Sequence, residues 1–155
     1  MDDRIADAVD YIAIRRLQSA YADTVNRRAW DEVRALFLPG AEIVVDRQGD
    51  EPLRYDATAF VGFIAKFVAP MDFFQFVMLN TIIDIQGDEA SARIYICEIR
   101  HDAHAGQTMG YALCRDSYRK IDGEWWLAGR HNRVMARSQT TSCNVFPMTA
   151  ADFEI

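Results

Sequence analysis

Residues 109–136 read MGYALCRDSYRKIDGEWWLAGRHNRVMA. The polar run Lys120–Gly123 divides this stretch into two segments rich in apolar residues, Met109–Arg119 and Glu124–Ala136. A short Asp-Gly turn between two such segments predicts a pair of antiparallel strands.

A second hairpin is expected immediately upstream. Gln86-Gly87-Asp88 separates Phe73–Ile85 from Ala90–Arg100, and the apolar period from Phe73 onward is two. In the strand Ala92–Glu98, Arg93 is charged, so we expect Ala92, Ile94 and Ile96 to face the core. Glu98 then follows onto the inner face, as a pocket carboxylate or at a strand end that solvent already reaches.

The N-terminal half reads as helix. Residues 3–26 carry apolar side chains at a helical period, which allows one long helix with a break near Asp10. Three further elements are expected: a helix over Ala29–Leu38 stopped by Pro39-Gly40, a strand over Glu42–Asp46, and a helix from an Asp56 N-cap through Phe67, after a loop over Arg47–Pro52. Helices followed by an antiparallel meander predict an α+β fold, in which a curved sheet wraps the helices around a pocket.

Composition limits the class of protein. Half of the 155 residues are apolar, so one domain with its own core is expected over residues 1–155. A net charge of -6 disfavours a nucleic-acid partner. No apolar run reaches the ~18 residues that span a bilayer, and the acidic start Met1-Asp2-Asp3-Arg4 lacks the apolar segment of a signal peptide, so a cytoplasmic protein is expected. Cys97, Cys114 and Cys143 fit neither a metal spacing nor an even disulfide set and are expected to be buried.

Two segments carry a resemblance to a known family. The first joins Ile14–Leu17 and Tyr21–Asp23 to Trp30–Ile43, and the second is Asp116–Arg130 with its Asp-Gly-x-Trp turn. They resemble the SnoaL-like branch of the nuclear-transport-factor-2-like (NTF2-like) superfamily, over nearly the whole chain, with the tail after Ser138 least matched. The resemblance implies a cone of three N-terminal helices on a curved, mostly antiparallel sheet. It is weak for activity, because the superfamily includes lyases, isomerases and binding modules.

The resemblance also implies where a catalytic pair would lie. The scytalone-dehydratase-like lyases use an Asp at the end of the first helix and a His on the strand after the third helix. Those positions fall here on Asn26 and Phe76, four residues before Asn80, and neither side chain can act as a base.

Other side chains are candidates to carry chemistry. His131 alternates with Trp125 and would face the apolar side, with an ordinary pKa suited to a general base. Asp116 could orient His131 across the hairpin, and the alternative is a surface charge. Tyr21 and Asp23 on the first helix complete the candidate set, although Asp23 also fits a solvated face. His101 and His104 lie in a turn and indicate no metal site.

These residues leave two interpretations open. The first is a cofactor-independent lyase or isomerase that acts on a planar aromatic or polyketide-like ligand. The second is a non-catalytic binding or assembly module, such as a ring-hydroxylating dioxygenase small subunit. A homo-oligomer, dimer or trimer, is expected, with Tyr95 and Cys97 on its outer sheet face. The predicted pocket is lined by Asn26, Phe60, Phe63, Phe76, Met78, Asn80 and Tyr111.

Overall fold

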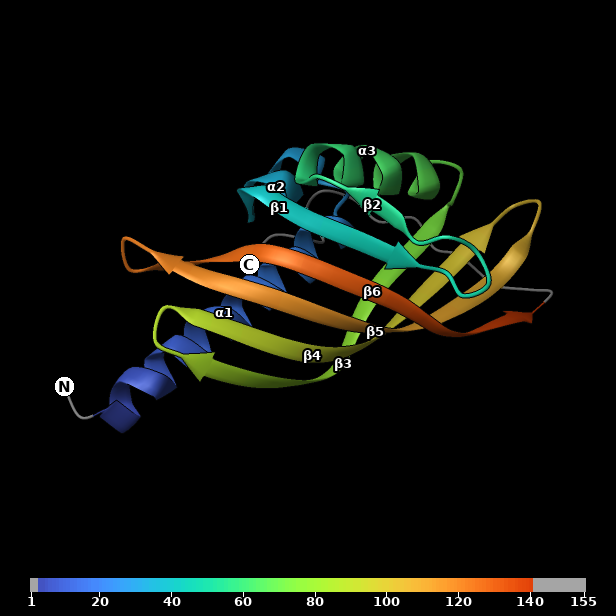
Figure 1. The fold of residues 1–155 in the computed structure, drawn as a ribbon. Coiled ribbons are helices and arrows are strands. Elements are labelled where there is room, and N and C mark those ends of the chain that lie inside the picture. Colours follow the sequence, from blue (N-terminus) through green and yellow to red (C-terminus); the bar gives the residue numbers. More distant parts are fainter. Residues whose placement is uncertain (1–2, 141–155) are drawn as a thin grey trace.

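The computed structural model describes residues 3–140, which form three helices and a six-stranded sheet (Figure 1). The elements are α1 (Asp3–Asn26), α2 (Trp30–Ala35), β1 (Phe37–Asp46), β2 (Leu53–Tyr55), α3 (Ala57–Val68), β3 (Phe73–Gln86), β4 (Glu89–Asp102), β5 (Gly106–Ile121) and β6 (Glu124–Thr140). Within residues 3–140, no helix is both long enough and apolar enough to cross a membrane.

The sheet confirms the predicted meander. Its strand order is β2-β1-β6-β5-β4-β3, and every neighbouring pair is antiparallel except β1 with β6. The β5–β6 turn has positive φ at both Asp122 (52°) and Gly123 (84°), which is the backbone of a two-residue hairpin turn that follows the strand twist. The predicted α+β class is therefore confirmed.

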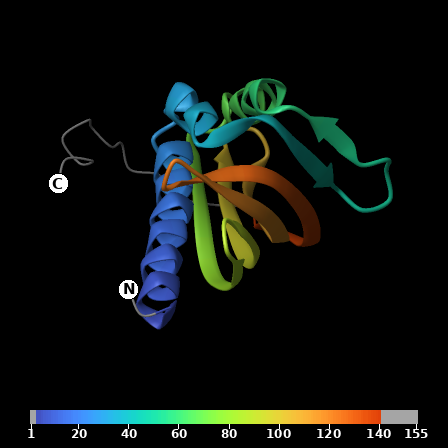
Figure 2. The ribbon, with the colours of Figure 1, turned by 60° about the vertical axis from the view of Figure 1, so that its left-hand side comes forward.

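Helix α1 lies against the curved sheet, with α2 and α3 above one end of it (Figures 1 and 2). Near its N-terminus, the Asp10 carboxylate accepts hydrogen bonds from Lys120 Nζ at 2.7 Å and from Trp125 Nε1 at 2.9 Å. These contacts attach α1 to the β5–β6 hairpin. The helix runs through Asp10 without interruption, so the break allowed by the sequence does not occur.

The segment between α1 and α3 differs from its prediction. Helix α2 ends at Ala35, and Pro39-Gly40 lies inside β1, where the pairing with β6 shifts between Phe37 and Glu42. Gly40 accommodates that irregularity with φ of 81°. The sequence also did not reveal β2. By contrast, Asp56 caps α3 as predicted and accepts a hydrogen bond from Ala59 N at 2.8 Å.

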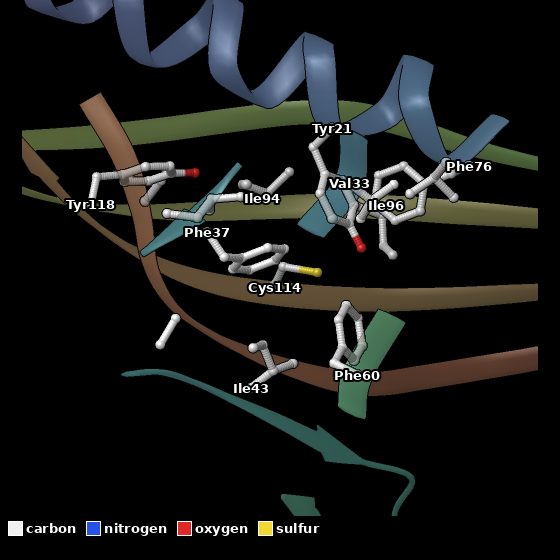
Figure 3. Packing of buried hydrophobic residues seen from close by; sticks show 14 of the residues in the cluster. Tyr21, Val33, Phe37, Ile43, Phe60, Phe76, Ile94, Ile96, Cys114 and Tyr118 are labelled. Carbon is white, nitrogen blue, oxygen red and sulfur yellow. The ribbon is translucent and has the colours of Figure 1, made fainter. Parts of the chain in front are cut away.

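The core lies between the helices and the inner sheet face (Figure 3). Phe60, Phe76, Ile94 and Trp125 are buried as expected, whereas Phe63 is only half-buried and stacks on Tyr55 with ring centroids 5.1 Å apart. Cys97 and Cys114 are buried free thiols, and Cys143 lies outside the described residues.

Three β-bulges change which residues face the core. The register of β3 against β4 skips Leu79, and the register of β6 against β5 skips Ala128 and Met135. Because a bulge inserts one extra residue, the side chains after it point to the opposite faces from those that simple alternation predicts.

Candidate active site

A cavity of about 310 Å³ lies between α1, α3 and the inner face of the sheet. This volume is near the lower end of small-molecule sites, which range from roughly 300 to 1,000 Å³. Aromatic rings dominate its walls, and Phe60, Phe63, Phe67, Phe74 and Phe76 all line it.

A larger hollow of about 720 Å³ opens on the other face of the sheet. Its walls include exposed charged side chains such as Arg93 and Arg115. We place the candidate site in the smaller cavity, because apolar walls with a few convergent polar groups are typical of ligand sites.

Six polar or charged side chains line the inner cavity: Glu98 and Arg100 from β4, Tyr21 from α1, Asn132 and Arg137 from β6, and Arg47, which follows β1. Glu98 and Arg100 form an ion pair in which their side chains are 19% and 16% exposed. The Arg100 guanidinium also lies 5.0 Å from the centroid of the Phe67 ring. Asn132 Oδ1 is buried without a hydrogen-bond partner among residues 3–140. The cavity therefore presents a carboxylate and an unused acceptor to whatever enters it.

Tyr21 is held as a rigid, neutral hydrogen-bond donor. Its ring packs edge-on against Phe76 at 5.4 Å and Phe37 at 6.1 Å, and its hydroxyl points into the core (Figure 3). Burial raises the pKa of Tyr21 to about 12, against the opposing effect of the Arg130 charge. At neutral pH the phenol is therefore protonated.

Behind Tyr21 lies a buried polar network. Arg130 donates two hydrogen bonds to Asp116, from Nε at 2.7 Å and from Nη2 at 2.6 Å, and its guanidinium carbon lies 4.0 Å from the Tyr21 ring centroid. Asp116 also accepts from the Tyr118 hydroxyl, which accepts from Gln18 Nε2 at 3.0 Å. Burial alone would lower the pKa of Arg130. The neighbouring Asp116 carboxylate nevertheless keeps that pKa above its ordinary value.

Three of the four predicted catalytic side chains, His131, Asp116 and Asp23, do not line the cavity. His131 is exposed and borders the hollow on the outer sheet face, so the expectation that it lies inside the pocket is wrong. The bulge at Ala128 causes the difference, because it directs Arg130 inward in place of His131. Asp116 accordingly pairs with Arg130. Asp23 is exposed and pairs with Arg27 at 2.8 Å.

Only some of the residues that were predicted to line the pocket do so. Phe60, Phe63 and Phe76 line the cavity, and Met78 packs beside the core. Asn80 lies beyond the bulge at Leu79 and is exposed, so its predicted place in the pocket is wrong. Tyr111 is likewise outside the pocket. It pairs with Cys97 across the β4–β5 ladder, on the face opposite Glu98, and its hydroxyl lies 3.7 Å from Met109 Sδ.

Asn26 has a structural partner and does not line the cavity. Its side-chain oxygen accepts from Phe76 N at 2.6 Å, and its side-chain nitrogen donates to Phe76 O at 3.1 Å. Strand β3 is at the edge of the sheet, where backbone groups lack a neighbouring strand. Asn26 therefore occupies the unpaired edge of β3 and joins it to the end of α1.

Asn26→Asp is expected to lower the free energy of unfolding by about 1 to 3 kcal/mol. The carboxylate still accepts from Phe76 N, but it cannot donate to Phe76 O and places negative charge beside that carbonyl oxygen. Urea unfolding measures the loss, and faster hydrogen exchange at the Phe76 amide locates it. Asn80→Asp makes the same chemical change at an exposed site and should stay within about 0.5 kcal/mol of the native protein. Equal losses in the two variants would contradict the role of Asn26.

Sequence comparison supplies the family. A model described as SnoaL-like domain matches residues 6–131. The chain belongs to the SnoaL-like family. No protein with a curated description matches its sequence.

Several solved structures share the fold of this chain. A protein from Novosphingobium aromaticivorans provisionally named scytalone dehydratase is 20% identical with a TM-score of 0.76, covering 96% of this chain and 97% of that one. The structure of LinA is 14% identical with a TM-score of 0.79, covering 96% and 100%. A type-2 LinA, named as a hexachlorocyclohexane dehydrochlorinase, is 17% identical with a TM-score of 0.74, covering 94% and 96%. These likenesses confirm the predicted NTF2-like fold, which this SnoaL-like chain shares with dehydratases and dehydrochlorinases.

The inner face also carries three residues that were not expected there from the sequence: Arg100, Arg130 and Asn132. Arg100 could have been found, since it continues the alternation Ile94, Ile96, Glu98 along β4. Arg130 and Asn132 depend on the bulge at Ala128. The signal for that bulge is the glycine next to it, because a glycine inside a strand often marks one.

Proposed function

We propose that this SnoaL-like protein is a cofactor-independent lyase or isomerase that moves a proton on a planar aromatic or polyketide-like ligand. The observation that supports it most directly is a carboxylate, Glu98, in the same apolar cavity as the neutral phenol of Tyr21. A base and a hydrogen-bond donor in one water-poor cavity are the groups that proton abstraction next to a carbonyl requires.

Each polar group has a role in this proposal. Glu98 takes the proton from a carbon next to the ligand carbonyl, and the electron pair of that C–H bond moves toward the carbonyl oxygen. The Tyr21 hydroxyl donates to that oxygen as its negative charge grows. Arg100 pairs with Glu98 and fixes the direction of its carboxylate. Asn132 Oδ1, which has no partner among the described residues, accepts from a ligand hydroxyl.

The walls support a flat ligand. Phe63 stacks on Tyr55 at an interplanar angle of 23° and on Phe67 at 14°, so three rings form a nearly parallel series along α3 and β2. Offset stacking on such rings favours planar aromatic molecules over branched ones of equal volume.

Proton exchange in D₂O tests the proposal without knowledge of the natural substrate. 2-Tetralone is a flat aromatic ketone with acidic protons next to its carbonyl. The protein should accelerate the loss of those proton signals in NMR spectra above the buffer rate, with saturation at high ketone concentration. Binding of 2-tetralone without any acceleration would refute proton transfer on this ketone class and favour the second candidate below.

The second candidate is a non-catalytic binding or assembly module. The observation that favours it is that Asn26 and Phe76, to which the family resemblance assigns the lyase Asp and His positions, hydrogen-bond to each other in a structural contact. A protein from Novosphingobium aromaticivorans provisionally named aromatic ring hydroxylase shares the fold at 23% identity and a TM-score of 0.71, covering 86% of this chain and 94% of that one. Stable co-purification with a dioxygenase large subunit would support this candidate.

The homo-oligomer and the cytoplasmic location stay predictions. The exposed apolar side chains of the described residues include Leu79 and Ile82, and Ile82 borders the hollow on the outer sheet face. Such a face suits a second copy of the chain. A molar mass from light scattering equal to one chain would contradict the oligomer.

A further inference from the structure

The inner cavity is unusually basic for this protein. Its lining includes three guanidinium groups, from the half-buried Arg100 and from the exposed Arg47 and Arg137, against the single carboxylate of Glu98, in a chain of net charge -6. Arg100 forms an ion pair with Glu98, and Arg47 forms one with Asp50 at 3.8 Å. Arg137 has no ion pair with any residue in the range 3–140.

Strand register places Arg137 and Glu98 in one row across the sheet. Arg137 on β6 is opposite Gly110 on β5, and Gly110 is opposite Glu98 on β4. The bulge at Met135 is the reason Arg137 lines the cavity. Val134 also lines the cavity. Val134 and Arg137 are three positions apart, so without the extra residue their side chains would point to opposite faces of the sheet.

Gly110 leaves the middle of that row without a side chain. The Arg100 guanidinium fills the space, since a Cβ on Gly110 would lie 2.6 Å from Arg100 Nη2. Arg100 Nε is buried and has no hydrogen-bond partner among residues 3–140. The Arg100 guanidinium therefore lies over Gly110 with an unused donor, and Arg137 is the register partner of Gly110 on the next strand.

We propose that this row is a subsite for an anionic group of the ligand, so that the protein takes planar aromatic molecules bearing a carboxylate. The inference rests on the proposed function, because it assigns the same cavity as the ligand site. Guanidinium groups suit a carboxylate because their planar donors match its two oxygens, and such charge-assisted bonds are stronger than neutral ones. Arg137 and Arg100 hold the anion at the sheet, while the ring system lies against Phe63 and Phe67.

Binding of two probes of equal shape tests the subsite. 2-Naphthoate carries a carboxylate, and 2-naphthamide carries a neutral amide in its place. Titration calorimetry should show that the protein binds 2-naphthoate at least about tenfold more tightly than 2-naphthamide. Arg137→Gln should remove most of that preference, and Arg137→Lys should keep part of it. Gly110→Ala, which displaces the Arg100 guanidinium, should also reduce it.

A matched control separates the subsite from general charge. Arg115 lies on the opposite face of β5 and is exposed, so Arg115→Gln changes the net charge equally without touching the cavity. It should leave the preference unchanged. Equal affinity for the two probes, binding of neither, or equal losses in Arg115→Gln and Arg137→Gln would overturn the inference.

Glu98→Gln distinguishes this inference from the proposed reaction. It should leave 2-naphthoate affinity equal to or higher than that of the native protein, because a like charge near the anion is removed. Tight naphthoate binding without any proton exchange would leave the anion subsite standing and refute only the proposed reaction.

Discussion

Asp116→Asn is expected to lower the free energy of unfolding by about 3 to 5 kcal/mol, because it leaves a buried guanidinium without its carboxylate. The side chains of Arg130 and Asp116 are 3% and 0% exposed, so water cannot replace the lost charge. The same change removes the negative acceptor that Tyr118 uses. Against a typical total of 5 to 15 kcal/mol, this loss is a large part of the stability, and it should appear in urea unfolding followed by near-UV circular dichroism.

Two further variants fix the interpretation of that loss. Asp31→Asn breaks an exposed pair with Arg34, in which the aspartate is 95% exposed, and should cost less than about 1 kcal/mol. Asp116→Leu combined with Arg130→Met removes both buried charges and should be more stable than Asp116→Asn alone, since no unpaired ion remains. A loss below about 1 kcal/mol for Asp116→Asn would show that Arg130 finds another partner or reaches solvent.

The order and type of most elements could be predicted from the sequence because they rest on local signals. The Asp-Gly turn at 122–123, the Asp56 cap and the period-two pattern of β4 each act over a few residues. Strand β4 itself contributes no extra residue to its pairing with β3 or with β5, so the phase set by Ala92 holds as far as Glu98. The sequence could therefore predict that Glu98 points inward, although a solvated strand end was the alternative.

For β6, the alternation at the start of the strand does not predict which face its later side chains point to. Trp125 and Leu127 face the core as alternation predicts, but the bulge at Ala128 reverses the facing of residues 129–134, and the bulge at Met135 reverses it again. Gly129 stands where a Cβ would come within 3.2 Å of Glu42 O, so the close passage of β1 explains the glycine beside the bulge. The role of Asn26 depends on a helix end meeting an edge strand 50 residues away, and no local pattern encodes that contact.

Glu98→Gln is expected to slow the proton exchange of 2-tetralone by at least about 10²-fold, the usual effect of losing a general base. The substitution keeps the size and shape of the side chain, so it isolates the loss of the basic oxygen. The amide can still accept from Arg100, which should preserve the position of both side chains and the walls of the cavity. The affinity for 2-tetralone should therefore change by only a few-fold, and the loss should appear in the maximal rate.

His131→Gln is the matched control for this measurement. His131 has an ordinary base on its side chain but lies exposed on the outer sheet face, so its loss should leave the exchange rate within about twofold of the native rate. Tyr21→Phe should have an intermediate effect, because it removes the donor to the developing oxyanion and keeps the base. Exchange that persists in Glu98→Gln but disappears in His131→Gln would move the reaction to the outer hollow. Exchange that persists in both would mean that the cavity binds the ketone without acting on it through Glu98.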